Sequence, residues 1–386
     1  MKIGSVLLAC LFIGLWLLAG CRSRLSPEVP TTAIKSGEIS QSAVKQSWEM
    51  EWENITKDAR KEGKLILYSE VGAELRIAFI EAMKEYGIAL ELISGRGREM
   101  AEKIIRERKS GIYDADLYIS GLSTIVNVMK PAGVFAPLES LLILPDVKDS
   151  KLWYKGRLNY TSEDKQILAF VAYLDHGIHV NTDIVKPGDI NSMQDLLSPR
   201  WKGKIISDDP TISGRGQNWM AVVSTKLGED YLKQLVKQEP LITRDLRQLT
   251  DWVARGRYPI GFGVRPDSYQ EYKRAGAPIT NLNMEEVSYL LAGIGQMGYI
   301  DKAPHPNATK VFLNWLLSRK GQTIWQEVRM DQSARIDTPI DHLEKAGYPV
   351  RKTTGDYFDV RKDRWELEDG LKARDLIIKS FSPLLR

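Results

Sequence analysis

Cysteine is the scarcest residue in this chain. Only Cys10 and Cys21 occur among its 386 residues, and both stand near the start. The rest of the chain therefore has neither a disulfide nor a thiol nucleophile, which excludes a disulfide-stapled scaffold and a cysteine-dependent enzyme. A fold without such bridges must rest on large hydrophobic cores, and a chain of this length can bury two of them.

Histidine is nearly as rare, with four residues in the whole chain. Only His176 and His179 stand close together. The Val180-Asn181-Thr182 that follows indicates an extended segment, in which side chains three positions apart point to opposite faces. We therefore interpret the pair as packing residues in a connection between domains. We predict no metal site among these histidines and no cofactor.

An excess of one charge is also missing. Lysine and arginine total 54 against 50 aspartate and glutamate, which gives a net charge of +4, and the two signs are interspersed. This pattern is typical of a solvated surface and lacks the basic patch of a nucleic-acid-binding protein. A hydrophobic content of 43% and a charged content of 27% indicate an ordinary globular protein.

The longest hydrophobic run stands at the very start. Met1 and Lys2 precede an apolar stretch from Ile3 to Gly20, which ends in Leu18-Ala19-Gly20-Cys21. A basic start, an apolar stretch and small residues before a cut site are typical of a secretory signal. The last four residues resemble the lipobox of bacterial lipoproteins, which implies a signal peptide over residues 1–20 and lipidation of Cys21. The alternative is an uncleaved membrane helix, because 18 residues are near the lower limit of a span.

Residues 21–47 are predicted to be a flexible tether, since they are rich in Ser, Thr and Pro and lack an apolar period. Strand and helix patterns alternate from Trp48 onward. Strands are expected at 64–68, 88–93 and 116–120, with helices at 75–86 and 100–105 between them. This βαβαβ rhythm predicts a parallel sheet with helices on both faces.

The same rhythm returns in the second half of the chain. Strands are expected at 204–207, 259–264, 279–282 and 287–294, and helices at 217–227, 231–237, 246–254, 267–275, 307–318, 322–328 and 367–378. We interpret the chain as two α/β lobes joined by crossings near 171–181 and 287–293. Lobe 1 comprises residues 48–172 and 292–386, and lobe 2 comprises residues 173–291. One larger α/β domain is the alternative, although it would need an unusually wide sheet.

Three segments resemble bacterial ABC-transporter solute-binding proteins of the ferric-ion, thiamine and phosphonate-binding type. They are Asn181-Thr-Asp-Ile-Val-Lys-Pro187, Met193-Gln-Asp-Leu-Leu-Ser-Pro-Arg-Trp-Lys-Gly-Lys204 with Asp208-Asp-Pro210, and Ala303-Pro-His-Pro-Asn-Ala-Thr-Lys-Val-Phe-Leu-Asn-Trp-Leu-Leu-Ser318. The resemblance implies a type II periplasmic-binding-protein fold with a small-molecule or ion ligand in an interlobe cleft. It also implies an ABC permease and its ATPase as partners, and a monomeric receptor outside the cytoplasm. The lipid anchor would hold it on the periplasmic side in a Gram-negative cell, or on the outer face of the membrane in a Gram-positive one.

Ligands of open α/β sheets bind beyond the carboxyl ends of the strands. The candidate ligand-binding residues therefore follow the expected strands, and two arginines follow apolar segments of lobe 2. They are Ser69, Glu70, Gly95, Arg96, Ser120, Gly121, Asp209, Thr211, Ser213, Gly214, Arg215, Gly216, Arg244 and Arg265.

The turn at 209–216 carries the strongest of these signals. Its glycines allow backbone N–H groups to converge before a helix, where the positive end of the helix dipole favours an anion. Thr211 and Ser213 add hydroxyl donors, and Arg215 adds a guanidinium fork. The alternative is an ordinary helix cap, with Ser213 satisfying the first turn and Arg215 in solvent.

The sequence leaves more than one chemical class of ligand open. Ferric-binding members of the family carry adjacent tyrosines after the strand expected at 259–264, where this chain has Arg265-Pro266. We therefore favour an anion such as a phosphonate, a phosphate ester or a carboxylate. The alternatives are ferric iron or a ferric chelate and, through Glu70 and Asp209, a cation such as thiamine or a polyamine.

We predict that the protein is not an enzyme. Neither a Gly-x-Ser-x-Gly elbow, nor a zinc-binding helix motif, nor a phosphate-loop lysine occurs in the sequence. A secreted hydrolase and a purely structural envelope lipoprotein are the distant alternatives. Ligand turnover would identify an enzyme, and a ligand-induced rise in melting temperature without turnover would identify a receptor.

Overall fold

The structure is a computed structural model that describes residues 39–212 and 214–385. Its first element is the helix α1 (Ile39–Glu62). The predicted signal peptide, Cys21 and the tether up to residue 38 lie outside the described residues. The tether was expected to reach residue 47, but the chain is already helical from Ile39. Ile55 and Ala59 are buried in the first core, and helix formation is cooperative, so a packed helix extends into a preceding polar segment. Within the described residues, no helix is long and apolar enough to cross a membrane.

Residues 45–386 form one compact unit, and its first sheet has the strand order β2-β1-β3-β13-β4, with β5 paired to β13. The strands are β1 (Lys64–Ser69), β2 (Ala89–Ser94), β3 (Leu117–Ser120), β4 (Phe135–Ala136), β5 (Ile167–Ala169) and β13 (Gln296–Ile300). β1 pairs in parallel with β2 and β3, as predicted. β13 is antiparallel to β3, β4 and β5, so the sheet is mixed rather than purely parallel.

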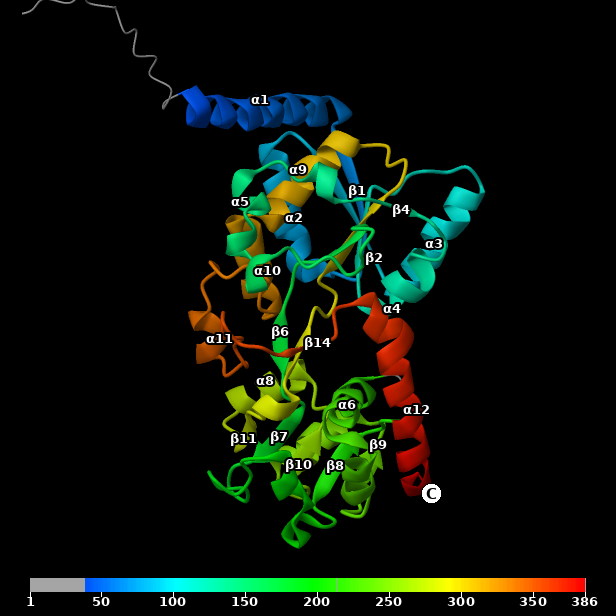
Figure 1. Ribbon diagram of the computed structural model, residues 1–386, viewed down its shortest axis with the longest axis vertical. Coiled ribbons are helices and arrows are strands. Elements are labelled where there is room, and N and C mark those ends of the chain that lie inside the picture. The colour runs from blue at the N-terminus through cyan, green and yellow to red at the C-terminus, as the bar shows by residue number, and fades with distance from the viewer. Residues whose placement is uncertain (1–38, 213, 386) are drawn as a thin grey trace, which may run out of the picture. The chain divides into compact units, whose positions relative to one another are not determined.

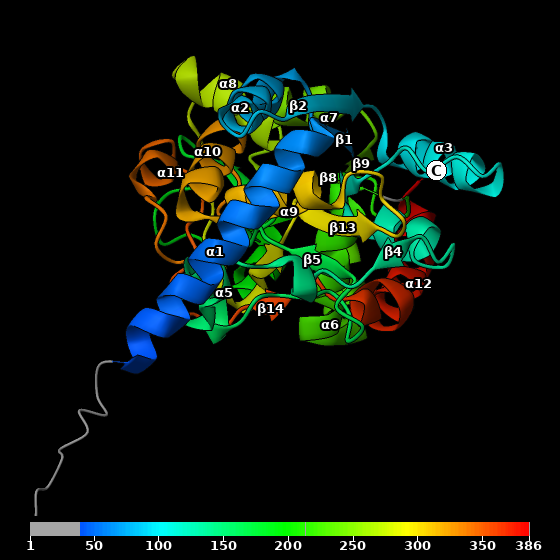
Figure 2. The same ribbon diagram turned by 90° about the horizontal axis from the view of Figure 1, so that it is seen from above.

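Helices cover both faces of this sheet. They are α2 (Ala73–Glu85), α3 (Gly97–Lys109), α4 (Leu122–Thr124), α5 (Pro145–Lys148), α9 (Pro306–Leu317) and α10 (Arg319–Arg329). Successive residues of β1 point to opposite faces: Leu65 and Leu67 join the core under α2 and α9, while Ile66 and Tyr68 join the core under α3. Figure 2 shows α9 and α10 beside each other on one side of the sheet.

The second sheet has the order β11-β7-β10-β8-β9. Its strands are β7 (Ile178–Asn181), β8 (Ile205–Asp208), β9 (Leu241–Thr243), β10 (Ile260–Phe262) and β11 (Ile279–Asn281), and its helices are α6 (Arg215–Val236), α7 (Leu246–Ala254) and α8 (Pro266–Arg274). β8 pairs in parallel with β9 and β10, whereas β7 is antiparallel to β10 and β11. The helices expected at 217–227 and 231–237 are one element, α6, with a kink at Gly228.

A small third sheet connects the two large ones, as Figure 1 shows. It contains β6 (Tyr173–Asp175), β12 (Tyr289–Leu291) and β14 (Phe358–Asp359) in the order β14-β12-β6. β6 and β12 coincide with the two predicted crossings, and they pair with each other in antiparallel fashion. β14 adds a third strand that was not predicted, and it runs parallel to β12.

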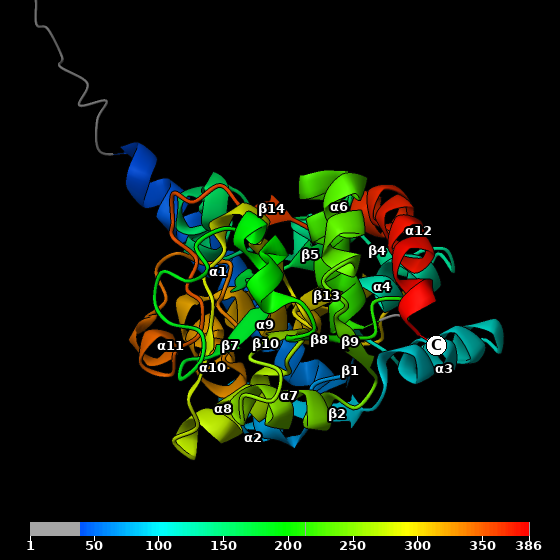
Figure 3. The ribbon, with the colours of Figure 1, turned by 90° about the horizontal axis from the view of Figure 1, so that it is seen from below.

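The C-terminal part of the chain departs from the expected lobe boundaries. Residues 292–386 were assigned to lobe 1, but helix α12 (Gly370–Phe381) packs against α6 of lobe 2. Its residues Ala373, Ile377 and Phe381 are buried in the same hydrophobic cluster as Trp219. Figure 3 shows α12 and α6 side by side. The charged pattern of this helix did not reveal which sheet its apolar stripe would cover.

Several short helices complete the structure. They are α11 (Asp341–Lys345), η1 (Ile125–Met129), η2 (Glu139–Leu141), η3 (Ser150–Leu152), η4 (Tyr154–Gly156), η5 (Met193–Leu197), η6 (Pro199–Trp201), η7 (Glu285–Val287), η8 (Trp365–Asp369) and η9 (Ser382–Leu384).

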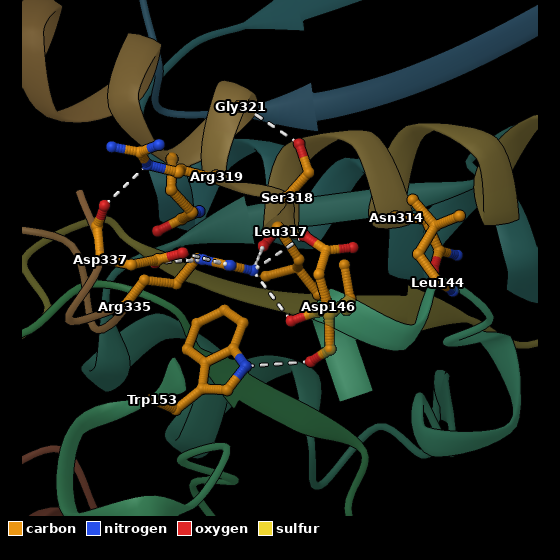
Figure 4. Close-up of polar contacts among 12 residues, drawn as sticks. Leu144, Asp146, Trp153, Asn314, Leu317, Ser318, Arg319, Gly321, Arg335 and Asp337 are labelled. Atoms are coloured by element: carbon orange, nitrogen blue, oxygen red, sulfur yellow. Dashed lines mark hydrogen bonds and ion pairs between the residues drawn. The ribbon is translucent and has the colours of Figure 1, made fainter. Parts of the chain in front are cut away.

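One buried arginine fixes the chain where it leaves α10. Arg335 is 1% exposed and forms a two-pronged ion pair with Asp337, with Nε–Oδ1 and Nη2–Oδ2 distances of 2.8 Å. Its Nη1 donates to the backbone oxygens of Asp146 and Leu317, each at 3.1 Å. The guanidinium also lies over the ring of Trp153. Figure 4 shows this cluster, which joins three separate chain segments of lobe 1.

Candidate ligand-binding site

The inner face of the third sheet carries polar side chains. Because β6 and β12 are antiparallel, Asp175 stands opposite Tyr289 and Tyr173 stands opposite Leu291, all on one face. The alternate residues Leu174 and Leu290 are buried on the other face. Two phenols and a carboxylate are therefore presented together at the junction of the lobes, next to two cavities.

Arg215, the first residue of α6, reaches this face from lobe 2. Its Nη2 forms an ion pair with Oδ2 of Asp175 at 2.5 Å. Its Nε is buried and has no hydrogen-bond partner in the described part of the chain. Burial alone would lower the pKa of Arg215, but the charge of Asp175 and the neighbouring phenols raise it above its usual value. Arg215 therefore stays cationic and keeps a donor that the protein itself does not satisfy.

The two tyrosines beside Arg215 are protonated at neutral pH. Burial raises the pKa of Tyr173, and the negative charge of Asp331 raises it further. Burial also raises the pKa of Tyr289 well above its usual value, with a further contribution from Asp175. Both phenols therefore act as hydrogen-bond donors rather than as anionic phenolates.

Two neighbouring cavities share Tyr173, Asp175, Arg215 and Gly293 as part of their walls. The backbone of Gly293 has φ +53°, and a Cβ added there would lie 3.3 Å from the Tyr173 hydroxyl. Glycine therefore allows the chain to turn close beside the phenol that both cavities use.

The smaller cavity, which we call the balanced cavity, has a volume of about 320 Å³. Three arginines and three acidic residues line it, so its charges cancel: Arg215, Arg361 and Arg374 against Glu70, Asp175 and Glu366. Its remaining hydroxyl and amide side chains are those of Ser123, Thr124, Tyr173, Asn218, Tyr289 and Gln296.

The larger cavity, which we call the arginine cavity, has a volume of about 910 Å³. Four arginines and two aspartates line it, an excess of two positive charges: Arg215, Arg265, Arg274 and Arg329 against Asp175 and Asp331. His179 also lines it, but burial lowers the pKa of that ring to about 4, so it adds no charge at neutral pH. An excess of cations in a concave, partly dry site attracts anions.

Three of the predicted lobe 1 residues converge on the balanced cavity. Glu70 follows β1 and accepts a hydrogen bond from the hydroxyl of Ser120 and another from the backbone N–H of Gly121. Its carboxylate lies against Gly97, where an added Cβ would be 1.8 Å from Oε1. Glu70 and Gly121 line the cavity, and Ser120 is buried behind them.

The predicted anion turn at 209–216 is occupied by the protein's own carboxylates. The backbone N–H of Gly216 donates to Oδ2 of Asp208 at 2.9 Å. The hydroxyl and N–H of Thr211 both donate to Asp209, which also pairs with Arg244 at 2.9 Å. The N-terminus of α6 therefore has an acceptor from within the protein. This agrees with the capping alternative, except that Asp208 is the acceptor observed. Gly214 is the N-cap residue of α6, and Ser213 lies outside the described residues.

The structure places the other predicted residues away from both cavities or at their edge. Ser69 is buried and accepts a hydrogen bond from the N–H of Val71. Gly95 is exposed, and the side chain of Arg96 is 88% exposed beside Glu99. The side chain of Arg244 is 69% exposed, whereas Arg265 lines the arginine cavity from the start of α8.

Sequence reasoning missed the residues at the centre of the site. Tyr173 and Tyr289 belong to the predicted crossings, so alternation along an extended segment could have identified their shared face. Asp331 and the cavity residues after position 358 carried no such signal. Among the described residues, no group of three or more histidine, cysteine, aspartate or glutamate side chains is placed to hold a metal ion.

Solved structures with the same fold cover most of this chain. The IdiA (FutA) protein of Trichodesmium, in complex with iron and citrate, is 20% identical with a TM-score of 0.61, over 83% of this chain and 99% of that one. AfuA of Actinobacillus pleuropneumoniae, with fructose-6-phosphate bound, is 19% identical with a TM-score of 0.56, over 84% and 99%. The ferric binding protein of Campylobacter jejuni is 15% identical with a TM-score of 0.59, over 82% and 99%.

No curated protein sequence matches the chain. The family described as bacterial extracellular solute-binding protein, in contrast, matches residues 70–328. That segment contains the second sheet, the strands of the first sheet other than β1, both β6 and β12, and most of the residues that line the two cavities. The chain therefore belongs to the family of bacterial extracellular solute-binding proteins and has the type II periplasmic-binding-protein fold.

Proposed function

We propose that this protein is the receptor of an ABC importer and that it binds a small organic anion between its lobes. The observation that carries the proposal is the arginine cavity, with four arginines against two aspartates around the unsatisfied Nε of Arg215. A phosphonate, a phosphate ester or a carboxylate offers the acceptor oxygens that guanidinium groups and protonated phenols bind.

The position of Arg215 explains how such a ligand would draw the lobes together. Arg215 belongs to lobe 2, while Arg329 ends α10 of lobe 1, and both line the arginine cavity. An anion that contacts both lobes gains interactions in the closed state that the open state lacks. Converting a mostly open receptor to a mostly closed one needs about 5.5 kcal/mol of differential affinity, much of which two or three charge-assisted hydrogen bonds supply.

Ferric iron is the second candidate, and one observation favours it. Tyr173, Tyr289, Asp175 and Asp331 bring four oxygen-bearing side chains to the cavity region. The raised pKa values of both phenols oppose the phenolate form that a bare ferric ion requires. A ferric chelate of a carboxylate would instead enter as an anion, and the related Trichodesmium protein was solved with iron and citrate.

We further propose that the chain is anchored by lipid at Cys21, outside the cytoplasm, and acts as a monomer with a permease and its ATPase. The lipobox-like residues 18–21 support the anchor. The family is extracellular, which agrees with export of residues 70–328. We propose that lobe 2 begins near residue 173, as expected from the sequence, and that it also includes α12.

Native mass spectrometry of the full chain purified from membranes tests both parts of this proposal. We expect a co-purified anion or ferric chelate in the folded protein, and a mature mass that starts at a lipid-modified Cys21. The Cys21→Ser variant should carry no lipid mass and should retain the solute. A bound cation such as thiamine, or a bare iron ion, would contradict the anion assignment. Lipid on the Cys21→Ser variant would contradict the anchor.

The carboxyl of Asp331, which lines the arginine cavity, should make the binding of an anion depend on pH. Burial raises the pKa of this carboxyl to about 6, although the nearby Arg329 lowers it. The carboxyl is ionised above pH 6 and opposes an anion, and it becomes neutral as the pH falls through 6. Sulfate, whose own charge is constant in this range, should therefore bind more tightly at pH 5 than at pH 7.5.

The Asp331→Asn variant provides the control for this pH dependence. In calorimetric titrations, it should bind sulfate at pH 7.5 about as tightly as the unmodified protein does at pH 5. A pH profile that is the same in both proteins would show that Asp331 does not control the affinity.

A further inference from the structure

The chain beyond the family-matched residues 70–328 contacts both lobes. Its longest helix, α12, is part of the lobe 2 core. Ala373, Ile377 and Phe381 are at most 7% exposed, and the helix lies against α6. Burial of these apolar side chains holds α12 firmly on lobe 2, because removing apolar surface from water stabilises the packed state.

The segment that leads into α12 is bonded to lobe 1 instead. Asp363 pairs with Nζ of Lys130 at 3.1 Å, and its backbone N–H donates to the oxygen of Thr161 at 3.2 Å. The amide Nδ2 of Asn127 donates to Oε1 of Glu366 at 3.0 Å. Lys130, Thr161 and Asn127 all belong to lobe 1. We call residues 360–369 the C-terminal strap.

Two arginines extend these contacts, Arg361 toward the connecting sheet and Arg374 toward lobe 2. Arg361 pairs with Asp359 of β14 and donates to the backbone oxygen of Val171, next to β6. Glu366 pairs in turn with Arg374 of α12 at 3.1 Å. A continuous chain of polar contacts therefore runs from lobe 1 through the strap to α12 of lobe 2, in addition to the connection through β6 and β12.

We propose that the C-terminal strap is an interlobe latch that sets the equilibrium between the closed and open arrangements of the two lobes. Rotation about β6 and β12 must separate the strap from lobe 1 or lift α12 from α6. The Lys130 and Asp363 side chains are 25% and 26% exposed, whereas Ala373, Ile377 and Phe381 of α12 are at most 7% exposed, so water replaces the contacts with lobe 1 more readily than those with α6. The strap therefore releases lobe 1 and moves with lobe 2.

The latch also borders the site. Arg361, Trp365 and Glu366 of the strap line the balanced cavity, so release of the strap opens one of its walls. The inference rests on the proposed binding between the lobes, but its test needs no solute. A failed search for the solute and a failed test of the latch can therefore be told apart.

The test measures the distance between the lobes by pulsed electron paramagnetic resonance. Spin labels are placed at Ile77 of α2 and Asp230 of α6, which are 68% and 92% exposed, in a full-length chain whose two native cysteines are replaced by serine. The Lys130→Gln/Asn127→Ala variant removes two contacts of lobe 1 with the strap. We expect the population with displaced lobes to rise about three- to tenfold, the range for the net loss of about one hydrogen bond.

A matched variant separates the latch from local effects on lobe 1. Lys130 also pairs with Asp164 at 3.3 Å, within lobe 1. The Asp164→Asn variant removes that pair and leaves Asp363 in contact, so its distance distribution should equal that of the parent chain. If the double variant does not fold, Asn127→Ala alone should shift the distribution in the same direction. Distributions that are the same in the parent and the strap variants would overturn the proposal, as would an equal shift in Asp164→Asn.

Discussion

The Arg215→Ala variant is expected to bind the anionic solute about 10- to 150-fold more weakly than the unmodified protein. This range corresponds to 1.5–3 kcal/mol, the contribution of a hydrogen bond to a charged group. Arg215 lines both cavities, and its Nε is the donor that no described residue satisfies. Removing it also leaves Asp175, 8% exposed, without its cation and facing the ligand. The lost donor and the unpaired carboxylate both weaken the binding of an anion.

Two further variants separate these effects in calorimetric titrations with the anion found by native mass spectrometry, or with sulfate. Arg215→Ala/Asp175→Asn removes the unpaired carboxylate, so it should recover part of the lost affinity. Arg244→Ala is the matched control, because Arg244 belongs to the same lobe but its side chain is 69% exposed and pairs with Asp209. It should change the affinity less than twofold. Equal affinity of Arg215→Ala and the unmodified protein would remove Arg215 from the site.

The Arg335→Met variant is expected to lower the free energy of unfolding by about 3–5 kcal/mol, the usual cost of breaking a buried ion pair from one side. Methionine fills much of the space of the arginine stem but provides no donor. Asp337 loses both of its bonds to Arg335, and the backbone oxygens of Asp146 and Leu317 each lose one (Figure 4). The burial of the guanidinium site and of the Leu317 backbone oxygen makes the loss large.

Arg319→Met is the matched control for this prediction. Arg319 is exposed, and its Nε donates to the backbone oxygen of Asp337 at 2.7 Å (Figure 4). Water can replace this bond, so the variant should lose less than about 1 kcal/mol. Urea unfolding of both variants at pH 7 measures the difference. A loss below about 1.5 kcal/mol for Arg335→Met would show that the arginine cluster does not stabilise lobe 1.

The strands and helices of both lobes were predictable because their sequence signals are local. The apolar run from Lys64 to Tyr68 became β1, and the stripe of Ala308, Val311 and Trp315 became the buried face of α9. The spacing of apolar residues shows whether a segment is a helix or a strand and which of its faces is buried. This signal depends only on residues that are close together in the sequence. The two crossings were located for the same reason, since both are short extended runs between longer patterns.

The antiparallel strand β13 and the C-terminal strand β14 were not predictable in this way. The pairing of these strands depends on which strand, distant in the sequence, has an unpaired edge. The spacing of apolar residues within a segment carries no information about that partner. The same holds for α12, whose apolar stripe shows that it packs but not that it packs on α6. Long-range topology decided these three elements.

The candidate site shows the same division. The rule that ligands lie beyond strand ends singled out Glu70 and Gly121, which line one cavity, and Arg215, which lines both. It did not reveal that Asp208 accepts the N–H of Gly216, because a strand residue can turn inward and cap the next helix only once both are folded. The expected anion turn was therefore already satisfied by the chain itself.

By itself, the sequence determined the two α/β lobes, their crossings and the membership of a solute-binding family, since these depend on local pattern and on matched motifs. Only the tertiary structure decided which charges meet. It placed Tyr173, Asp175 and Tyr289 beside Arg215, and it carried the C-terminal strap across both lobes. Coulombic and hydrogen-bond energies depend on distances in space, and separation along the chain does not specify those distances.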